Sequence, residues 1–116
     1  MLPELLIKNS QAQVLRSLIM RDSLCTVGRD ASCSVVLPSP DISRVHGAFT
    51  HSAQHGVLSV EDLHSKNGVF VNGLRMRRSV LYAGDVVCIG NYKIYVRQGS
   101  SMPPKMGVAL AKILAN

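Results

Sequence analysis

Three short segments of the chain carry side chains suited to holding an anion. Each stands beside a stretch that is expected to be extended, so each is expected to be a loop. The segments are Gly28-Arg29-Asp30, Asp41-Ile42-Ser43-Arg44-Val45-His46 and His64-Ser65-Lys66-Asn67-Gly68.

The polar groups of these segments are mostly hydrogen-bond donors. Arg29 and Arg44 carry planar guanidinium groups that match two phosphate oxygens at once. Ser43 adds a hydroxyl and Lys66 an ammonium, while the amide of Asn67 suits an extended peptide backbone better than a phosphate. The set contains no evident general base. This chemistry indicates that an anion is held rather than cleaved.

Catalytic and metal-binding functions are disfavoured by the surrounding sequence. Ser43 and His46 are not framed by a Gly-x-Ser-x-Gly elbow, and no third orienting carboxylate is evident. Four histidines are present, but no cysteine stands beside them at zinc-binding spacing. We therefore expect no enzyme activity, no metal site and no cofactor.

Short extended segments separated by turns must position the loops. Asn67-Gly68 and Asn72-Gly73 are dipeptides that accept positive φ, and Pro38 and Pro40 open a loop. Many short strands with no helix between them are typical of an antiparallel sandwich. The expected strands are 4–8, 14–20, 24–27, 34–37, 45–51, 57–62, 69–71, 79–82, 86–89 and 92–97.

The composition is that of one globular domain. The chain has 116 residues, of which 47% are hydrophobic and 17% charged, enough for a single core. Tryptophan is absent and aromatic residues are scarce, so the core must depend on Val, Ile, Leu and Met. The leaning towards β-branched residues favours sheet over helix.

The net charge of +6 does not select a partner by itself. A nucleic-acid-binding protein should interleave basic residues with exposed aromatic ones or present a recognition helix, and neither pattern is found. The one basic cluster, Arg75, Arg77 and Arg78, is interpreted as a solvated face. We expect no binding of nucleic acid or membrane.

The order of the motifs resembles that of a forkhead-associated (FHA) domain, over nearly the whole of 4–97. The resemblance implies a β-sandwich of two twisted, mostly antiparallel sheets with about eleven strands, which recognises phosphothreonine peptides through loops at one end. The motifs are Gly28-Arg29, Ser43-x-x-His46, Ser65-Lys66-Asn67-Gly68, Asn72-Gly73, Gly84-Asp85 and Ile89-Gly90.

The resemblance also implies a role for each loop residue. Arg29 and Ser43 would contact the phosphate directly, and Arg44 and Lys66 would add further phosphate contacts. Asn67 would bond the peptide main chain beside the phosphorylated residue. The loops would be supported from behind by Gly28, His46, Ser65 and Gly68.

Two positions bear on how closely the chain follows the family. Val69 stands where many members have threonine after Asn-Gly, which removes one hydroxyl from the loop support. Asp41 occupies a position that in some members reads the side chain three residues after the phosphothreonine. An acidic group there favours a basic or neutral partner residue.

The resemblance implies an adaptor in Ser/Thr kinase signalling. Its partner would be a phosphothreonine-containing protein, either a kinase substrate or the kinase itself. The alternative function is phosphate-independent docking by a scaffold domain of the same fold.

The remaining expectations concern the ends and the cysteines. Residues 1–98 are expected to form the domain, and 99–116 a linker followed by an amphipathic helix at 105–115 or a disordered tail; the oligomeric state stays open. The opening residues do not resemble a signal peptide and no apolar run could cross a bilayer. With an odd count of three cysteines, a reduced, cytoplasmic setting is expected, with Cys88 an ordinary buried thiol.

Overall fold

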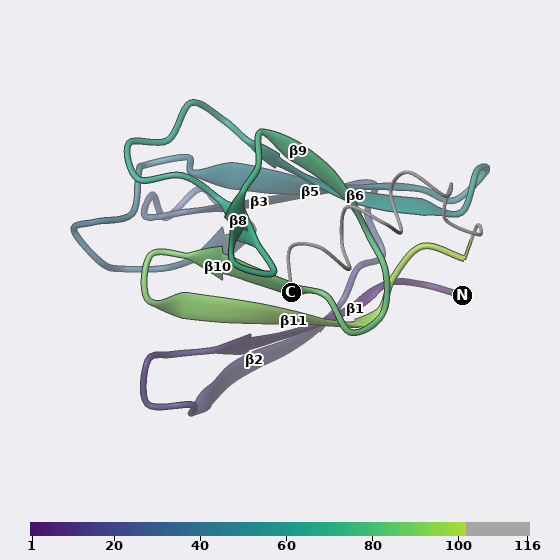
Figure 1. Ribbon diagram of the computed structural model, residues 1–116, viewed down its shortest axis with the longest axis horizontal. Coiled ribbons are helices and arrows are strands. Elements are labelled where there is room, and N and C mark those ends of the chain that lie inside the picture. Colours follow the sequence, from purple (N-terminus) through teal and green to yellow (C-terminus); the bar gives the residue numbers. More distant parts are fainter. Residues whose placement is uncertain (102–116) are drawn as a thin grey trace.

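The computed structural model describes residues 1–101 as eleven β-strands in two sheets that lie over each other (Figure 1). No helix occurs in this range, and therefore none long and apolar enough to cross a membrane. The strands are β1 (Glu4–Lys8), β2 (Val14–Ile19), β3 (Leu24–Gly28), β4 (Val35–Val36), β5 (Gly47–Ser52), β6 (Val57–Asp62), β7 (Phe70–Val71), β8 (Leu74–Arg75), β9 (Arg78–Leu81), β10 (Val86–Ile89) and β11 (Tyr92–Gln98).

The sheets have six and five strands. The larger has the order β2-β1-β11-β10-β7-β8 and the smaller the order β4-β3-β5-β6-β9. The pairing of β3 with β4 is parallel and the other described pairings are antiparallel. The predicted sandwich of mostly antiparallel sheets is confirmed.

Ten of the strands correspond to the ten predicted stretches, with ends that differ by at most two residues. The eleventh, β8, was not predicted from the pattern. It has two residues and follows the turn at Asn72-Gly73, so no alternation of polar and apolar residues can reveal it.

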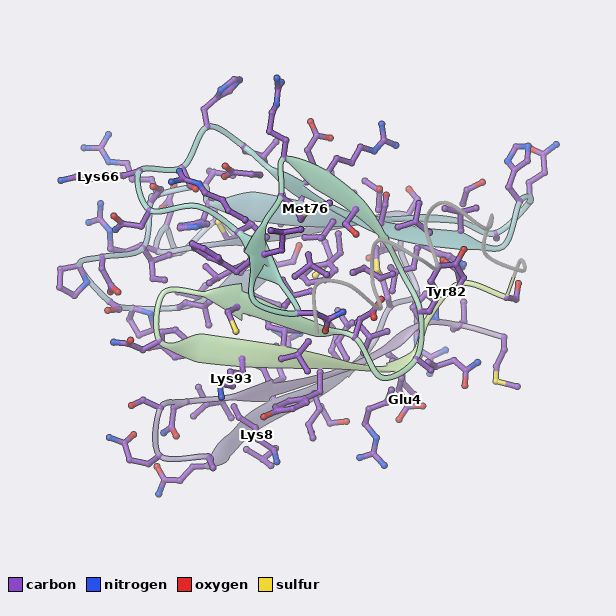
Figure 2. All side chains as sticks on the ribbon, in the orientation of Figure 1. Glu4, Lys8, Lys66, Met76, Tyr82 and Lys93 are labelled. Atoms are coloured by element: carbon purple, nitrogen blue, oxygen red, sulfur yellow. The ribbon has the colours of Figure 1, made fainter. Side chains whose placement is uncertain are left out.

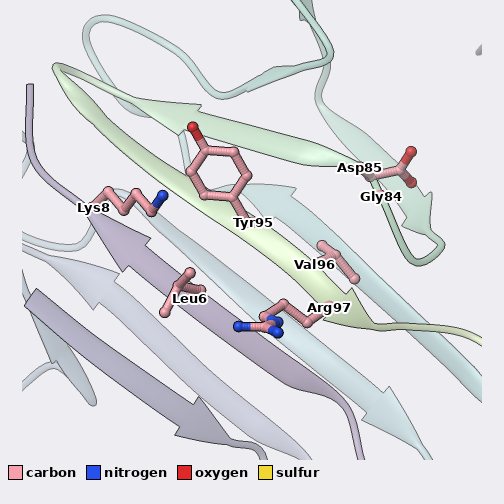
Figure 3. Close-up of a pocket in the computed structure, with 7 residues that line it drawn as sticks. All are labelled: Leu6, Lys8, Gly84, Asp85, Tyr95, Val96 and Arg97. Atoms are coloured by element: carbon pink, nitrogen blue, oxygen red, sulfur yellow. The ribbon is translucent and has the colours of Figure 1, made fainter. Parts of the chain in front are cut away.

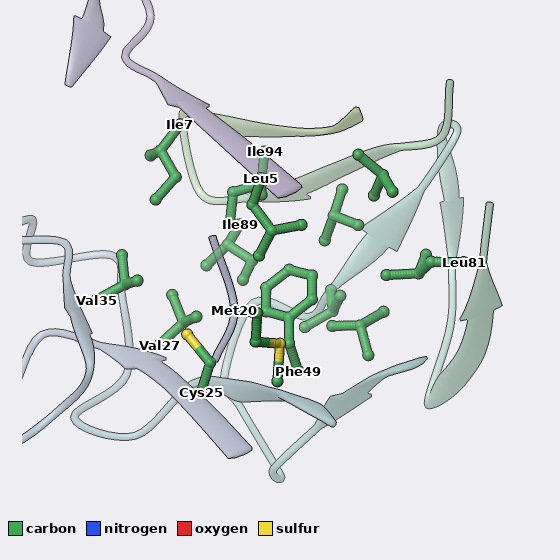
Figure 4. Packing of buried hydrophobic residues seen from close by; sticks show 14 of the residues in the cluster. Leu5, Ile7, Met20, Cys25, Val27, Val35, Phe49, Leu81, Ile89 and Ile94 are labelled. Carbon is green, nitrogen blue, oxygen red and sulfur yellow. The ribbon is translucent and has the colours of Figure 1, made fainter. Parts of the chain in front are cut away.

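Alternation of side chains places a core between the sheets (Figure 4). Leu5 and Ile7 of β1, Ile94 of β11 and Phe49 of β5 belong to this core, and all four are almost fully buried. Each such side chain stabilises the fold by about 1.5–3 kcal/mol. In β6 a strict alternation of buried and exposed side chains fails, because Ser59 is buried between Leu58 and Val60.

The burial of Ser59 has a local cause. Ser59 faces Thr50 across the β5–β6 pair, and their hydroxyls are hydrogen-bonded at 2.7 Å. A satisfied hydroxyl can be buried at little cost. The polar side chain of Ser59 is therefore no guide to its burial.

Two of the sequence motifs, Asn72-Gly73 and Gly84-Asp85, contact each other. Asn72, with φ of 51°, donates its side-chain N–H to Asp85 at 3.0 Å and accepts the Val86 N–H at 2.9 Å. The other Asp85 oxygen accepts the Tyr82 N–H at 2.8 Å. The Asn-Gly and Gly-Asp motifs thus hold the β7–β8 and β9–β10 turns together.

The register of the five-stranded sheet gathers the three anion-holding loops. Val27 near the end of β3 pairs with Gly47 at the start of β5, and Gly47 pairs with Asp62 at the end of β6. Three neighbouring strand ends therefore lie in one row. The loops that leave them share one end of the sandwich, on the left in Figure 1.

The described chain continues past the predicted domain end at residue 98. Ser100 donates its N–H to Leu81 O and its hydroxyl contacts the Leu58 backbone, while the Ser101 N–H bonds Gly56 O. Residues 99–101 thus lie against β6 and β9. The predicted helix at 105–115 lies outside the described residues.

The three cysteines are free thiols. Cys25 and Cys33 are buried, whereas Cys88 is half-buried, so its prediction as a buried thiol was wrong. Cys88 lies between the fully buried Val87 and Ile89 and therefore points to the outer face of its sheet. Desolvation by burial raises the pKa of both the Cys25 and Cys88 thiols.

Alkylation should reveal these raised pKa values. At neutral pH, iodoacetamide should modify Cys25 and Cys88 more slowly than a cysteine in an unstructured peptide, because the thiolate is the nucleophile. Peptide mapping by mass spectrometry measures this, with the urea-unfolded chain as the control. Rapid alkylation of the folded chain at neutral pH would contradict this prediction.

The free energy of unfolding should also fall above the ordinary thiol pKa of 9.0, since the unfolded chain then loses protons that the folded one keeps.

Candidate functional site

A fully buried histidine links the second loop to the third. His46 Nδ1 accepts the Ser43 N–H at 3.1 Å, and His46 Nε2 lies 2.7 Å from Gly68 O. Because Nδ1 accepts, the ring proton is on Nε2, which donates to the carbonyl. The imidazole is therefore neutral and joins the second loop to the third.

The backbone of His46 holds the loops to the sheet. Its N–H donates to Val27 O at 2.8 Å, and its carbonyl accepts the Leu63 N–H at 3.0 Å. Side chain and main chain together tie the end of β3, the 41–46 loop, the end of β6 and the 64–68 loop to one residue.

Arg29 is fixed against the second loop. Its N–H donates to Ser43 O at 3.0 Å, and its side-chain Nε donates to Ile42 O, also at 3.0 Å. Ile42 is itself fully buried, so the carbonyl that holds the guanidinium is anchored in the core. Four terminal guanidinium N–H groups remain for other acceptors.

Arg44 lies beside Arg29 at the surface. Both arginines are exposed, and with Asp30 and Ala31 they line one shallow depression. The Asp30 N–H donates to Arg44 O at 3.0 Å, which joins the two loops once more. The depression is therefore framed by two fixed backbone segments that each carry a cation.

Gly28 allows this close approach. A Cβ at Gly28 would lie 2.2 Å from Arg44 O and 2.9 Å from Val45 Cα. Any larger residue would push the second loop away from the end of β3. The Gly-Arg pair thus sets the spacing between the arginines.

The third loop is a tight turn closed by Ser65. The Ser65 N–H donates to Asp62 Oδ1 at 3.0 Å, and its hydroxyl oxygen accepts the Gly68 N–H at 2.9 Å. Gly68 has φ of 91°, in the left-handed region that favours glycine. The turn directs Gly68 O at His46 and leaves Lys66 and Asn67 exposed at its tip.

The tip of the third loop contacts the second loop. The Lys66 N–H donates to Ser43 Oγ at 3.1 Å, and Asn67 Nδ2 donates to Asp41 O at 2.8 Å. Because the Ser43 hydroxyl accepts there, its own proton remains available to a ligand. Figure 2 shows Lys66 at the end of the molecule where the loops gather.

The carboxylate of Asp41 lies at the rim of this arrangement. It accepts a hydrogen bond from the Ser39 hydroxyl, and its other oxygen would lie 3.0 Å from a Cβ placed on Gly90. Asp41 is half-buried and its carbonyl holds Asn67. The acid is therefore next to the residue expected to meet a peptide main chain.

All ten predicted site residues lie in the three linked loops, and none is remote from the others. Sequence reasoning missed Arg75, whose guanidinium would lie 2.6 Å from a Cβ on Gly68. Arg75 is exposed, as its interpretation as part of a solvated face requires, but it also lies over this loop. Its place over the third loop follows from β8, the strand that the pattern did not reveal.

A second hollow lies apart from the loops, on the outer face of the six-stranded sheet (Figure 3). Leu6 and Lys8 of β1 and Tyr95 of β11 line it, and Lys8 Nζ stands 5.0 Å from the centre of the Tyr95 ring. It contains none of the predicted site residues. Nor do residues 1–101 hold a cluster of three or more His, Cys, Asp or Glu side chains that could bind a metal.

The profile of the FHA domain family matches residues 25–90 of this chain. The DNA damage response protein kinase DUN1 of Saccharomyces cerevisiae is 35% identical in an alignment of 80 residues that covers 62% of this chain and 15% of the kinase. The oxoglutarate dehydrogenase inhibitor of Corynebacterium diphtheriae is 34% identical over 74 residues, which are 64% of this chain and 50% of the inhibitor. The chain thus spans half or less of the length of these relatives.

Solved structures of FHA domains are also similar to this chain. One, from a structural and functional analysis of phosphothreonine-dependent FHA domain interactions, superposes with a TM-score of 0.70 at 27% identity and covers 88% of this chain and 99% of that one. The FhaA FHA domain, solved in complex with the intracellular domain of another protein, gives a TM-score of 0.72 at 28% identity over 82% of this chain and 99% of that one. By the family match and the shared sandwich, the chain belongs to the FHA domain family.

Proposed function

We propose that the chain binds phosphothreonine in partner proteins through its three linked loops and acts as an adaptor in Ser/Thr kinase signalling. An FHA domain is a non-catalytic binding module, which favours recognition over chemistry. The observation that carries the proposal is the fixed position of Arg29 beside Ser43, with Nε held by the buried Ile42 carbonyl.

The donors suit a phosphate in number and charge. A phosphothreonine carries a charge of about −1.5 to −2 and three strong acceptor oxygens. The terminal N–H groups of Arg29, the Ser43 hydroxyl and the exposed cations of Arg44 and Lys66 would meet them. Each charge-assisted hydrogen bond contributes about 1.5–3 kcal/mol, so three or four suffice for reversible binding after the cost of association.

The peptide main chain would be held by Asn67. Within residues 1–101 its side chain makes one hydrogen bond, to Asp41 O, so one amide N–H and the amide oxygen can meet a backbone. Two solved structures of similar FHA domains support a protein partner: one comes from a study of phosphothreonine-dependent FHA domain interactions, and the other is a complex with the intracellular domain of another protein. A kinase or its substrate is the partner class that we propose.

Arg29→Ala should abolish most of the phosphopeptide affinity while leaving the fold intact. Loss of about 2–3 kcal/mol of charge-assisted bonding lowers affinity roughly 30- to 150-fold, whereas an exposed loop arginine contributes little to the core. Calorimetric titration with a phosphothreonine peptide and thermal unfolding measure the two effects.

Arg16→Ala is the matched control for Arg29→Ala. Arg16 is also exposed and also donates to a backbone carbonyl, that of Ser34 at 2.8 Å, but it lies on β2 outside the loops. Its replacement should leave the affinity unchanged. Equal affinity of the wild-type chain for the phosphorylated and unphosphorylated peptides would refute the phosphate site and favour phosphate-independent docking.

His46→Ala should weaken both stability and binding, because His46 positions the loops without touching the ligand. The change leaves the Ser43 N–H and Gly68 O without a buried partner, at a cost of about 1–3 kcal/mol each. His46→Asn keeps an acceptor near the place of Nδ1 and should recover part of the loss. Urea unfolding and titration are the measurements; full affinity in the His46→Ala variant would exclude a positioning role.

Asp41→Asn should broaden the choice of peptide. With the carboxylate present, a basic or neutral residue three places after the phosphothreonine should be preferred over an acidic one, by simple charge attraction. The amide should reduce that preference without loss of phosphate dependence. An oriented peptide library measures it, and selection of Asp at that place by the wild-type chain would contradict the prediction.

A further inference from the structure

Among residues 1–101, strand β2 is an open sheet edge with an apolar surface. It pairs with β1 on one side and ends the six-stranded sheet on the other. Val14, Leu15 and Ile19 are 57%, 51% and 46% exposed. Charged side chains and proline usually protect an edge from pairing with another chain. The six residues of β2 include no proline and one charged side chain, Arg16, which is hydrogen-bonded to Ser34 O of its own chain.

The backbone groups that point outward from β2 can be assigned. The Met20 N–H donates to Pro3 O at 2.9 Å, so these residues form a hydrogen-bonded pair next to the strand. Hydrogen-bonded and non-bonded pairs alternate along an antiparallel ladder. In the observed register, Leu18 and Arg16 therefore bond to β1, and Ser17 and Ile19 direct their N–H and C=O groups to the open edge.

We propose that a second copy of this chain pairs with β2 along this edge, antiparallel, with Ser17 opposite Ser17. A two-fold axis at Ser17 places outward-directed groups opposite each other, so the two serines exchange both backbone hydrogen bonds. Leu15 of each copy then stands opposite Ile19 of the other. Four exposed apolar side chains are thereby paired.

The charges favour this register over the neighbouring one. An axis at Arg16 would set two guanidinium groups directly opposite each other, which destabilises a strand pair. With the axis at Ser17, each Arg16 stands opposite Leu18 of the other copy. Arg16 is also held to its own chain by the bond to Ser34 O.

The pairing would join two six-stranded sheets into one sheet of twelve strands. The β1–β2 turn lies at the same end of the sandwich as the three linked loops (Figure 1). An antiparallel partner would therefore direct its own loops toward the opposite end. The two loop ends of the dimer face away from each other and can engage separate partners.

Mass measurement of the full chain tests the interface without any peptide, so its result is independent of the proposed function. The wild-type chain should sediment as a dimer and Ile19→Lys as a monomer. Leu74→Lys is the matched control, since Leu74 is 49% exposed on β8, the other edge strand of the same sheet. It should stay dimeric, with a thermal midpoint like that of Ile19→Lys. A wild-type chain that is monomeric up to about 1 mM, or a dimer that survives Ile19→Lys, would overturn the proposal.

Cross-linking tests the register even if Ile19→Lys disturbs the fold. Hydrogen-bonded residues in an antiparallel pair have Cα atoms about 5.5 Å apart, within the disulfide range of about 4.4–6.8 Å. In a Cys88→Ser background, Ser17→Cys should form an intermolecular disulfide under mild oxidation. Ile19→Cys should not, because the two copies of that residue are displaced by four residues, or about 14 Å along the strands at about 3.4 Å per residue. Cross-linking of Ile19→Cys with none of Ser17→Cys would refute the register.

Discussion

The loop end of this domain depends on the buried imidazole of His46. Its two ring nitrogens hold the Ser43 N–H and Gly68 O, groups 25 residues apart in the chain. Both partners are main-chain groups, and a neutral imidazole offers one acceptor and one donor at opposed positions on a rigid ring. The arrangement of exposed donors above it follows, because Ser43 and the turn that carries Lys66 and Asn67 are the segments it joins.

The sandwich supplies the fixed surface on which this contact is possible. The row formed by the ends of β3 and β6 and the start of β5 sets the distance between loops before any polar side chain acts. The aliphatic core around Phe49 holds the sheets together, and Ile42 carries that rigidity into the second loop. Arg29 is thus bound to a carbonyl that cannot easily move. A preorganised guanidinium loses less conformational freedom when it binds an anion.

Most of the fold could be predicted from short-range pattern, since side-chain alternation and turn dipeptides are local properties. The failures have local physical causes as well. β8 is too short to show a period, Ser59 is buried because Thr50 satisfies its hydroxyl, and Cys88 faces outward although its neighbours are core residues. Of these three, only Ser59 is decided by a contact from another strand. The place of Arg75 is likewise non-local, since the β7–β8 pairing brings it over Gly68.

The sequence by itself determined the class of fold and the residue types of the loops, including the donor-rich set from Arg29 to Asn67. Their chemistry follows from the side chains, and the role expected of each residue follows from the family resemblance. Only the tertiary structure decided how the loops are held: the acceptor role of His46 Nδ1, the anchoring of Arg29 Nε by Ile42 O, and the 2.2 Å limit at Gly28. It also decided that β2 ends a sheet. These features join residues far apart in the chain. A local sequence pattern carries no information about which backbone donors and acceptors of one segment will bond to a distant segment.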